Sequence, residues 1–139
     1  MDIEKIHKAI VQRLKNNGCH VEPADVTEGF PKPSYFVEMD YGSIEMVNPF
    51  QDDIEIVGSI QYVPKVETKY ELLQCQKFLR SILMRNPIKT DEGSICIHKL
   101  EFDTSLFPTL VVTFSINITE EVIDDEEYEK FENLDLGGI

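Results

Sequence analysis

The cysteine and histidine side chains are where nucleophilic chemistry would be found in this chain of 139 residues. Cys96 and His98 are two positions apart, so on a strand both side chains would point to the same side. An imidazole beside a thiol could then activate it as a nucleophile. Neither an oxyanion-binding loop nor an orienting acid is recognisable, and a half-buried thiol beside a polar residue explains the pair more simply. We therefore expect no catalytic residues.

The sequence also lacks the residue spacings that are typical of metal and cofactor sites. The chain has no Cys-x-x-Cys or His-x-x-x-His pattern and no glycine-rich phosphate loop. Cys19-His20 could bind a metal only with ligands from elsewhere in the fold, and a loop thiol beside a surface imidazole is the simpler interpretation. Asp52-Asp53 and the run 124–127 lack the alternating ligands of a calcium loop. We expect no metal, no cofactor and no enzymatic activity.

Composition describes an acidic, globular chain. Hydrophobic residues make up 42% and charged residues 28%, and the length suits one domain. No apolar run approaches ~18 residues, and the acidic start lacks an apolar stretch, so we expect no transmembrane helix, no membrane partner and no signal peptide. The odd number of well-separated cysteines, Cys19, Cys75 and Cys96, predicts reduced thiols.

The net charge of −13 bears on nucleic acids. Affinity for nucleic acid comes from cations that neutralise phosphates, so this balance disfavours sequence-specific binding. It is compatible with an acidic lumen through which DNA passes, because like charges repel and prevent the phosphates from sticking.

Much of the negative charge is near the C-terminus. Between Glu120 and Asp135 there are nine acidic residues and a single cation, Lys130. Such a run is typical of a solvated tail. Tyr128, Phe131 and Leu134 interrupt it at three-residue spacing, which would place them near one helical face and could dock the segment on another subunit. We predict a domain over 1–119 and an acidic tail over 120–139.

Two amphipathic helices are indicated by apolar residues at steps of three and four. The first is predicted over about 2–16, and Asp2 can cap its start. The second is predicted over about 69–85, after a capping box formed by Thr68 and Glu71. Its apolar face is wide, which is expected for a helix that packs on a sheet.

Alternating apolar residues predict strands over 34–41, 44–48, 54–62, 95–102 and 110–118. A short edge strand is predicted over 21–26, interrupted by Pro23. Tyr41-Gly42-Ser43 is interpreted as a hairpin turn, and a change of phase predicts a β-bulge near His98 or Lys99. Gly58, in mid-strand, predicts a bulge, a bend or a close contact. The order αβββαββ predicts an α+β fold, with an antiparallel or mixed sheet, two helices packed on one face, and the acidic C-terminal tail.

Three phenylalanines occur in predicted loops, each beside a proline: Phe30, Phe50 and Phe107. They could cap the ends of the sheet core, or lie in an interface where aromatic anchors carry much of the binding energy. The residues that we propose as candidates for an oligomer or tube interface are Gly29, Phe30, Pro31, Pro33, Phe50, Phe107, Tyr128, Phe131 and Leu134.

The segment 26–37 joins a Glu-Gly-Phe turn and two prolines to an aromatic strand, about thirty residues into the chain and after a helix. In this pattern the chain resembles the small tail terminator proteins of phages and phage-like contractile particles, over roughly residues 1–120. The positions that match are Gly29, Phe30, Pro33, Tyr35 and Phe36.

The resemblance implies a structural role without catalytic residues. It implies a subunit that forms a homo-oligomeric ring, in this family typically a hexamer. The ring caps the tail tube, stops its growth and joins it to the neck or head. Implied partners are the tail tube protein and possible sheath and neck or head-completion proteins. The implied location is the tail of a virion or phage-like particle, assembled in the bacterial cytoplasm.

Other functions stay open on the sequence. A head–tail connector or head-completion protein is similarly small and ring-forming, and position in the particle would separate it from a terminator. An unrelated cytosolic protein-binding adaptor would be a monomer or dimer with a specific protein ligand. An enzyme would have Cys96 and His98 as its site.

Overall fold

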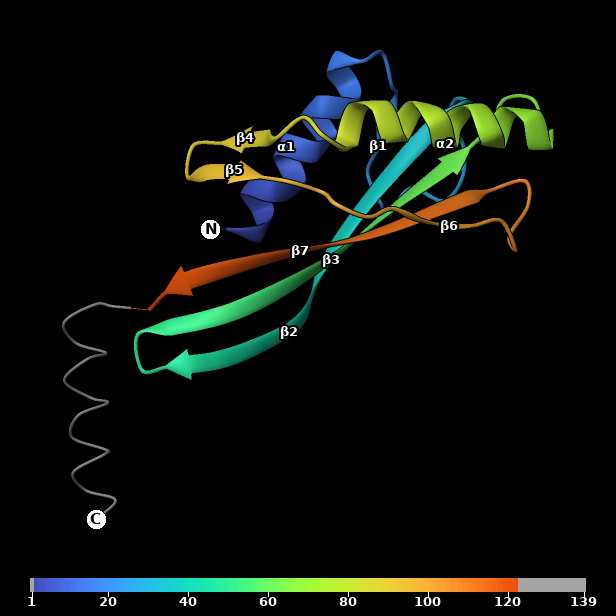
Figure 1. Ribbon diagram of the computed structural model, residues 1–139. Helices are drawn as coiled ribbons and strands as arrows, with labels where there is room; N and C mark the ends of the chain where they lie inside the picture. Colours follow the sequence, from blue (N-terminus) through green and yellow to red (C-terminus); the bar gives the residue numbers. More distant parts are fainter. Residues whose placement is uncertain (1, 123–139) are drawn as a thin grey trace.

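The computed structural model describes residues 2–122, which fold around a mixed sheet of five strands. The elements are α1 (Ile3–Asn16), β1 (Val21–Glu22), β2 (Ser34–Asn48), β3 (Gln51–Val63), α2 (Lys69–Leu83), β4 (Ile88–Thr90), β5 (Gly93–Ile95), β6 (Glu101–Asp103) and β7 (Leu110–Glu121). The sheet order is β1-β2-β3-β7-β6, and β4 and β5 form a separate two-stranded sheet. Only β1 is parallel to its neighbour. Both helices lie over the same side of the main sheet (Figure 1), so the predicted α+β class is confirmed.

The helices begin where the capping residues predicted. The Asp2 carboxylate accepts a hydrogen bond from the Glu4 amide at 3.0 Å, and the Thr68 hydroxyl accepts one from the Glu71 amide at 3.2 Å. Ile6, Ile10 and Leu14 of α1 are fully buried, and α2 contributes Leu72, Cys75, Leu79, Ile82 and Leu83 to the same core. The apolar periodicity of both helices therefore faces the sheet.

Gly58 is buried at the centre of the sheet, opposite Phe114 on β7. A Cβ atom at position 58 would lie 2.2 Å from the Phe114 ring, so the glycine leaves the space that this ring occupies. Of the three outcomes predicted for Gly58, the structure has the close contact.

The predicted hairpin at Tyr41-Gly42-Ser43 is wrong, because β2 continues to Asn48 and turns at residues 49–50. The pairing with β3 shifts its register between Tyr41 and Ser43, which is a β-bulge. Gly42 permits it, since a Cβ there would lie 2.6 Å from the Glu55 carboxylate. A glycine between two apolar runs marked a bulge and not a turn.

The predicted strand over 95–102 is also wrong as a single element. β5 ends at Ile95, Ile97 makes one isolated bridge with Met84, and β6 starts at Glu101 and pairs with β7. The change of phase near His98 therefore arises where the chain crosses from the small sheet to the edge of the main sheet. At the other end, β7 continues to Glu121, beyond the predicted end at residue 118.

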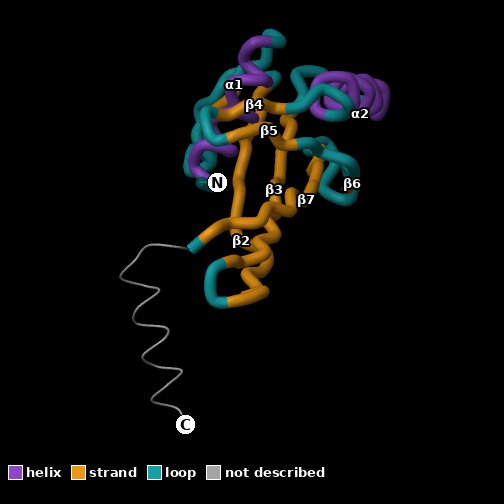
Figure 2. Tube along the Cα trace, turned by 60° about the vertical axis from the view of Figure 1, so that its left-hand side comes forward, coloured by secondary structure: helices purple, strands orange, loops and turns teal. Residues whose placement is uncertain are grey.

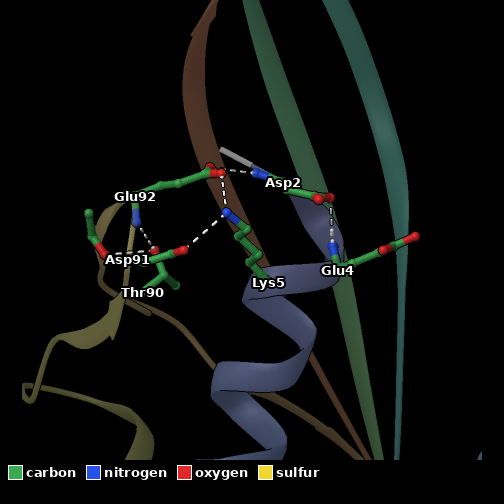
Figure 3. Close-up of polar contacts among 7 residues, drawn as sticks. Asp2, Glu4, Lys5, Thr90, Asp91 and Glu92 are labelled. Carbon is green, nitrogen blue, oxygen red and sulfur yellow. Dashed lines mark hydrogen bonds and ion pairs between the residues drawn. The ribbon is translucent and has the colours of Figure 1, made fainter.

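Polar contacts tie the start of α1 to the turn between β4 and β5 (Figure 3). The Lys5 ammonium lies 3.1 Å from the Asp91 carboxylate and 2.8 Å from that of Glu92, which also accepts the Asp2 amide at 3.0 Å. The hydrogen bond with Glu92 is the main cause that raises the pKa of Lys5, and the same bond lowers the pKa of Glu92. These exposed pairs position the small sheet beside α1 without contributing much stability.

Candidate functional site

Among residues 2–122, no hydrogen bond joins a cysteine thiol to an imidazole. Cys96 and His98 are both exposed, outside any regular strand. The His20 ring lies 2.5 Å from the Glu22 carboxylate, and no group of three metal-binding side chains occurs within residues 2–122. Cys75 is buried, 3.7 Å from the Tyr35 hydroxyl, and burial raises the pKa of its thiol to about 12. A thiol that stays protonated at neutral pH is a packing residue and not a nucleophile.

The Glu-Gly-Phe-Pro loop is a built turn at the start of β2. Gly29 has φ +75°, in the left-handed region that favours glycine. The ring of Phe30 packs edge-on against Phe36, with 5.0 Å between centroids and planes at 82°. The Ser34 hydroxyl donates to the Pro31 carbonyl. Phe30 is thus half-buried over the sheet face that points away from the helices, and Gly29, Pro31 and Pro33 remain exposed.

The three loop phenylalanines do not come together. Phe30 and Phe107 lie at the end of the sheet where β2 and β7 begin, and Phe50 lies at the opposite end, where the carbonyl of Phe50 accepts the Val122 amide at 2.9 Å. Phe107 is exposed and Phe50 is half-buried. The three are therefore candidates for contacts at two separate ends of the subunit. Tyr128, Phe131 and Leu134 lie outside the described residues.

The structure shows one further surface that sequence reasoning missed, which we call the arm. It consists of residues 40–48 of β2, 51–55 of β3 and 117–121 of β7, and it extends beyond both helices (Figure 1). Near the start of α1, Ile3 and His7 line a hollow together with Met39 of β2, and residues 40–47 of β2 are all exposed. On β2 the arm is therefore exposed, whereas Ile54 of β3 is 6% exposed and belongs to the core.

The arm continues the apolar row of the core without a cover. In β2 this row runs through Tyr35, Val37 and Met39, and the pairing with β3 keeps Tyr41, Ile44 and Met46 on the same face. Tyr41 is 52% exposed, Ile44 57% and Met46 64%. Isolated apolar residues on a surface are ordinary, but a row that extends a buried core is a candidate for a contact surface.

Both edges of the arm are open within residues 2–122. β1 pairs only with Tyr35 and Phe36, so the outer edge of β2 has no neighbouring strand from residue 37 onward. β6 pairs only with residues 111–113 of β7, so among the described residues no strand lies beside the outer edge of β7 from Phe114 to Thr119. Soluble proteins commonly protect such edges with lysine, yet β2, β3 and β7 contain no lysine. Open edges present backbone groups that can pair with another chain.

The charge of these strands has one sign. β2, β3 and β7 together contain eight carboxylates and no lysine, arginine or histidine. Six of the eight point away from the helices: Glu38, Asp40, Glu45, Asp53, Glu55 and Glu121. Three of them surround a hollow of about 380 Å³, where the Thr119 hydroxyl donates to Asp53 at 3.0 Å. The absence of any cation from 34 to 63 was the signal in the sequence that could have revealed this face.

A comparison with protein families found one whose model matches most of the chain. Residues 5–129 match the model of a family described as "Phage tail terminator protein". No curated protein matches the chain. Among the described residues, no helix is long and apolar enough to cross a membrane.

Proposed function

The chain belongs to the phage tail terminator family, and on that premise we propose that it forms a ring that caps the tail tube and joins it to the neck or head. In this proposal the ring is a hexamer of identical subunits, and it ends tube growth by occupying the last layer. The observation that carries the proposal is the arm, a piece of sheet whose apolar row is exposed on β2 and whose β2 and β7 edges have no neighbouring strand among the described residues.

The arm supports contacts between neighbouring subunits. One open edge belongs to β2 and the other to β7, so they are different surfaces on opposite sides of the arm. Contact between two different surfaces is heterologous, and heterologous contacts close into rings when the rotation between subunits permits. A neighbouring subunit that covers Tyr41, Ile44 and Met46 would remove their apolar surface from water. Burial of apolar surface stabilises the contact by roughly 25 cal/mol per Å².

The acidic face of the sheet is proposed to face the channel of the ring. The carboxylates on that face have no cation among the three strands that carry them. DNA that moves through such a channel is repelled by the wall and does not bind it, because binding would need cations to replace the condensed counterions. The proposal gives the protein a structural role in the virion tail, without catalysis and without sequence-specific recognition of DNA.

The partners follow from this placement. One rim of the ring would contact the tail tube protein, and the other would contact neck or head-completion proteins, with sheath as a further partner in a contractile tail. Phe50 lies at the arm end of the sheet and Phe30 and Phe107 at the other, so loop aromatics lie at both ends. The particle would be assembled in the bacterial cytoplasm.

The test uses purified tail tubes and the full-length chain. We expect rings at tube ends by electron microscopy, and tubes that stop growing when the protein is added. A variant with Tyr41, Ile44 and Met46 all changed to serine should fold but cap no ends. A matched control, Leu106→Ser, removes an equally exposed leucine outside the arm and should cap as well as the unchanged protein. Capping by the triple variant would contradict the role of the arm, and unchanged protein found only at the head side of the neck would indicate a connector.

A further inference from the structure

A groove between α2 and the segment that leads into β6 differs from the rest of the surface. Its volume is about 320 Å³, near the lower end of the range for ligand sites. Its charged and apolar lining residues include Lys77, Arg80, Lys99, Leu73, Leu100 and Phe102. The lining includes three cations and one histidine but no carboxylate, on a chain that has twice as many acidic as basic residues. This groove is a local reversal of the charge of the molecule.

The cations of the groove are available for a partner. Within residues 2–122, Lys77 and Arg80 form no ion pair, and Lys99 has an exposed one with Glu101 at 3.0 Å. The floor between them is apolar, with Leu73 47% exposed and Phe102 40% exposed. An occupant that fits this groove carries large apolar side chains together with negative charge.

We propose that the groove binds the C-terminal segment of a second copy of this chain, residues 123–139. That segment contains seven carboxylates and one lysine, interrupted by Tyr128, Phe131 and Leu134. The three apolar side chains would contact Leu73, Leu100 and Phe102, and the flanking carboxylates would pair with Lys77, Arg80 and Lys99. The inference rests on the proposed ring, because it requires neighbouring copies.

A second copy is favoured over the same chain by distance along the sheet. Phe102 at the groove pairs with Val112 on β7. From there β7 runs away from β6 (Figures 1 and 2). The ten residues from Val112 to Val122 span roughly 33 Å at the rise of a strand. The six residues from Val122 to Tyr128 span at most about 20 Å when fully extended, and less as a helix. Tyr128 therefore falls short of the roughly 33 Å back to Val112. The set of three apolar residues therefore cannot reach its own groove together.

The contact would also have the geometry of ring assembly. A segment that leaves one end of the sheet would bind a groove at the other end of the neighbouring sheet. Segment and groove are different surfaces, so the contact is heterologous and can be repeated from copy to copy. It would act beside the arm and not in place of it, because the groove and the arm lie at opposite ends of β7.

The first experiment measures binding of a fluorescent peptide of residues 123–139 to the full-length protein by anisotropy. Replacing Lys77 and Arg80 by glutamate should weaken binding about tenfold, because two attractive pairs become repulsive. The matched control, Lys65→Glu with Lys69→Glu, reverses the same charge at two exposed positions outside the groove lining and should leave binding unchanged. A peptide with serine at positions 128, 131 and 134 should also bind weakly. Equal binding to both double variants, or full binding of the serine peptide, would overturn the proposal.

The second experiment identifies which copy supplies the segment. A photo-crosslinking amino acid replaces Phe131 in an equal mixture of light and heavy isotope-labelled full-length protein on tube ends. We expect cross-links into residues 73–84 or 98–102 that join light to heavy chains. Cross-links within one isotope only would show that the chain occupies its own groove, and cross-links to the tube protein would show a different partner; either result overturns the proposal.

The two experiments separate this inference from the capping function. If unchanged protein caps tubes and the groove variant caps equally without cross-links, the groove assignment fails and capping stands. If no protein caps tubes but the peptide still binds according to the charges of the groove, capping fails and the groove remains a contact between copies.

Discussion

The two ends of the β2–β3–β7 sheet follow the same alternation of apolar and polar residues and yet have opposite surroundings. At the end beneath the helices, Val37, Ile60 and Val112 form a buried row. In the arm the row continues through Ile44 and Met46, where both side chains are more than half exposed. Alternation therefore indicates which face of a strand is apolar, and it does not indicate whether the same subunit covers that face.

The glycines of the two regions show the same difference. Gly58 leaves space for the buried ring of Phe114. Gly42 leaves space for the end of Glu55 and for Val57, which is partly exposed. The covered region is constrained by packing, and the arm is shaped by the bulge.

The largest difference in stability between the two ends of the sheet is expected when an isoleucine at each end is replaced by alanine. Ile60→Ala should lower the free energy of unfolding by about 2–5 kcal/mol, because the side chain is fully buried. Ile44→Ala should change it by no more than about 0.5 kcal/mol in the isolated subunit, because the side chain is exposed. Urea unfolding of both variants measures this contrast. Equal losses would mean that the arm is packed within its own subunit.

A smaller contrast is expected for the two glycines. Gly58→Ala should destabilise the subunit by about 1–3 kcal/mol, because the new methyl group overlaps the Phe114 ring. Gly42→Ala should cost less than Gly58→Ala, since the Glu55 carboxylate and the exposed Val57 side chain can shift more easily than the buried Phe114 ring. Thermal unfolding provides the measurement. Adding Phe114→Leu to Gly58→Ala should recover part of the loss, and no recovery would argue against the ring contact as its cause.

The smallest effect is expected from alkaline pH and concerns only the covered region. The thiol of Cys75 has a folded pKa raised to about 12, above its unfolded pKa of about 8.5. Its contribution to stability is therefore complete below pH ~8.5 and is lost as the pH rises toward 12, because the unfolded state releases the proton first. Between pH 7.5 and 9.5 the loss should be about 1 kcal/mol under reducing conditions.

Two cysteine variants test the origin of that loss by urea unfolding at both pH values. Cys75→Ala should flatten the dependence on pH, while Cys96→Ala, at an exposed position, should leave it unchanged. Tyr62, whose pKa burial raises to about 12, adds a further loss only above pH ~10. A dependence that persists in Cys75→Ala would assign it to another group.

Local patterns in the sequence predicted the helices and their starts correctly. Asp2 and Thr68 accept the hydrogen bonds expected of capping residues, and the apolar steps of α1 and α2 face the core. The resemblance in the segment 26–37 led to the family that residues 5–129 match. The interface candidates and the division at residue 119 stay predictions, and β7 continues past that division to Glu121.

The errors in the strands have one physical origin. Gly42 was interpreted as a turn and the change of phase near His98 as a bulge, and both depended on pairing with residues distant in the sequence. A glycine permits a turn or a bulge equally well, and only the partner strand selects between them. The phase of an edge segment likewise depends on which sheet it joins.

What the sequence by itself determined was local: the capped amphipathic helices, the alternation of the long strands, and strands without a single cation. What only the tertiary structure decided was coverage and convergence. The helices end before the sheet does, which leaves Tyr41, Ile44 and Met46 exposed, and α2 comes beside the segment before β6, which gathers Lys77, Arg80 and Lys99 around one groove. The physical reason is that burial and local charge are sums over neighbours in space, and most of those neighbours are far apart along the chain.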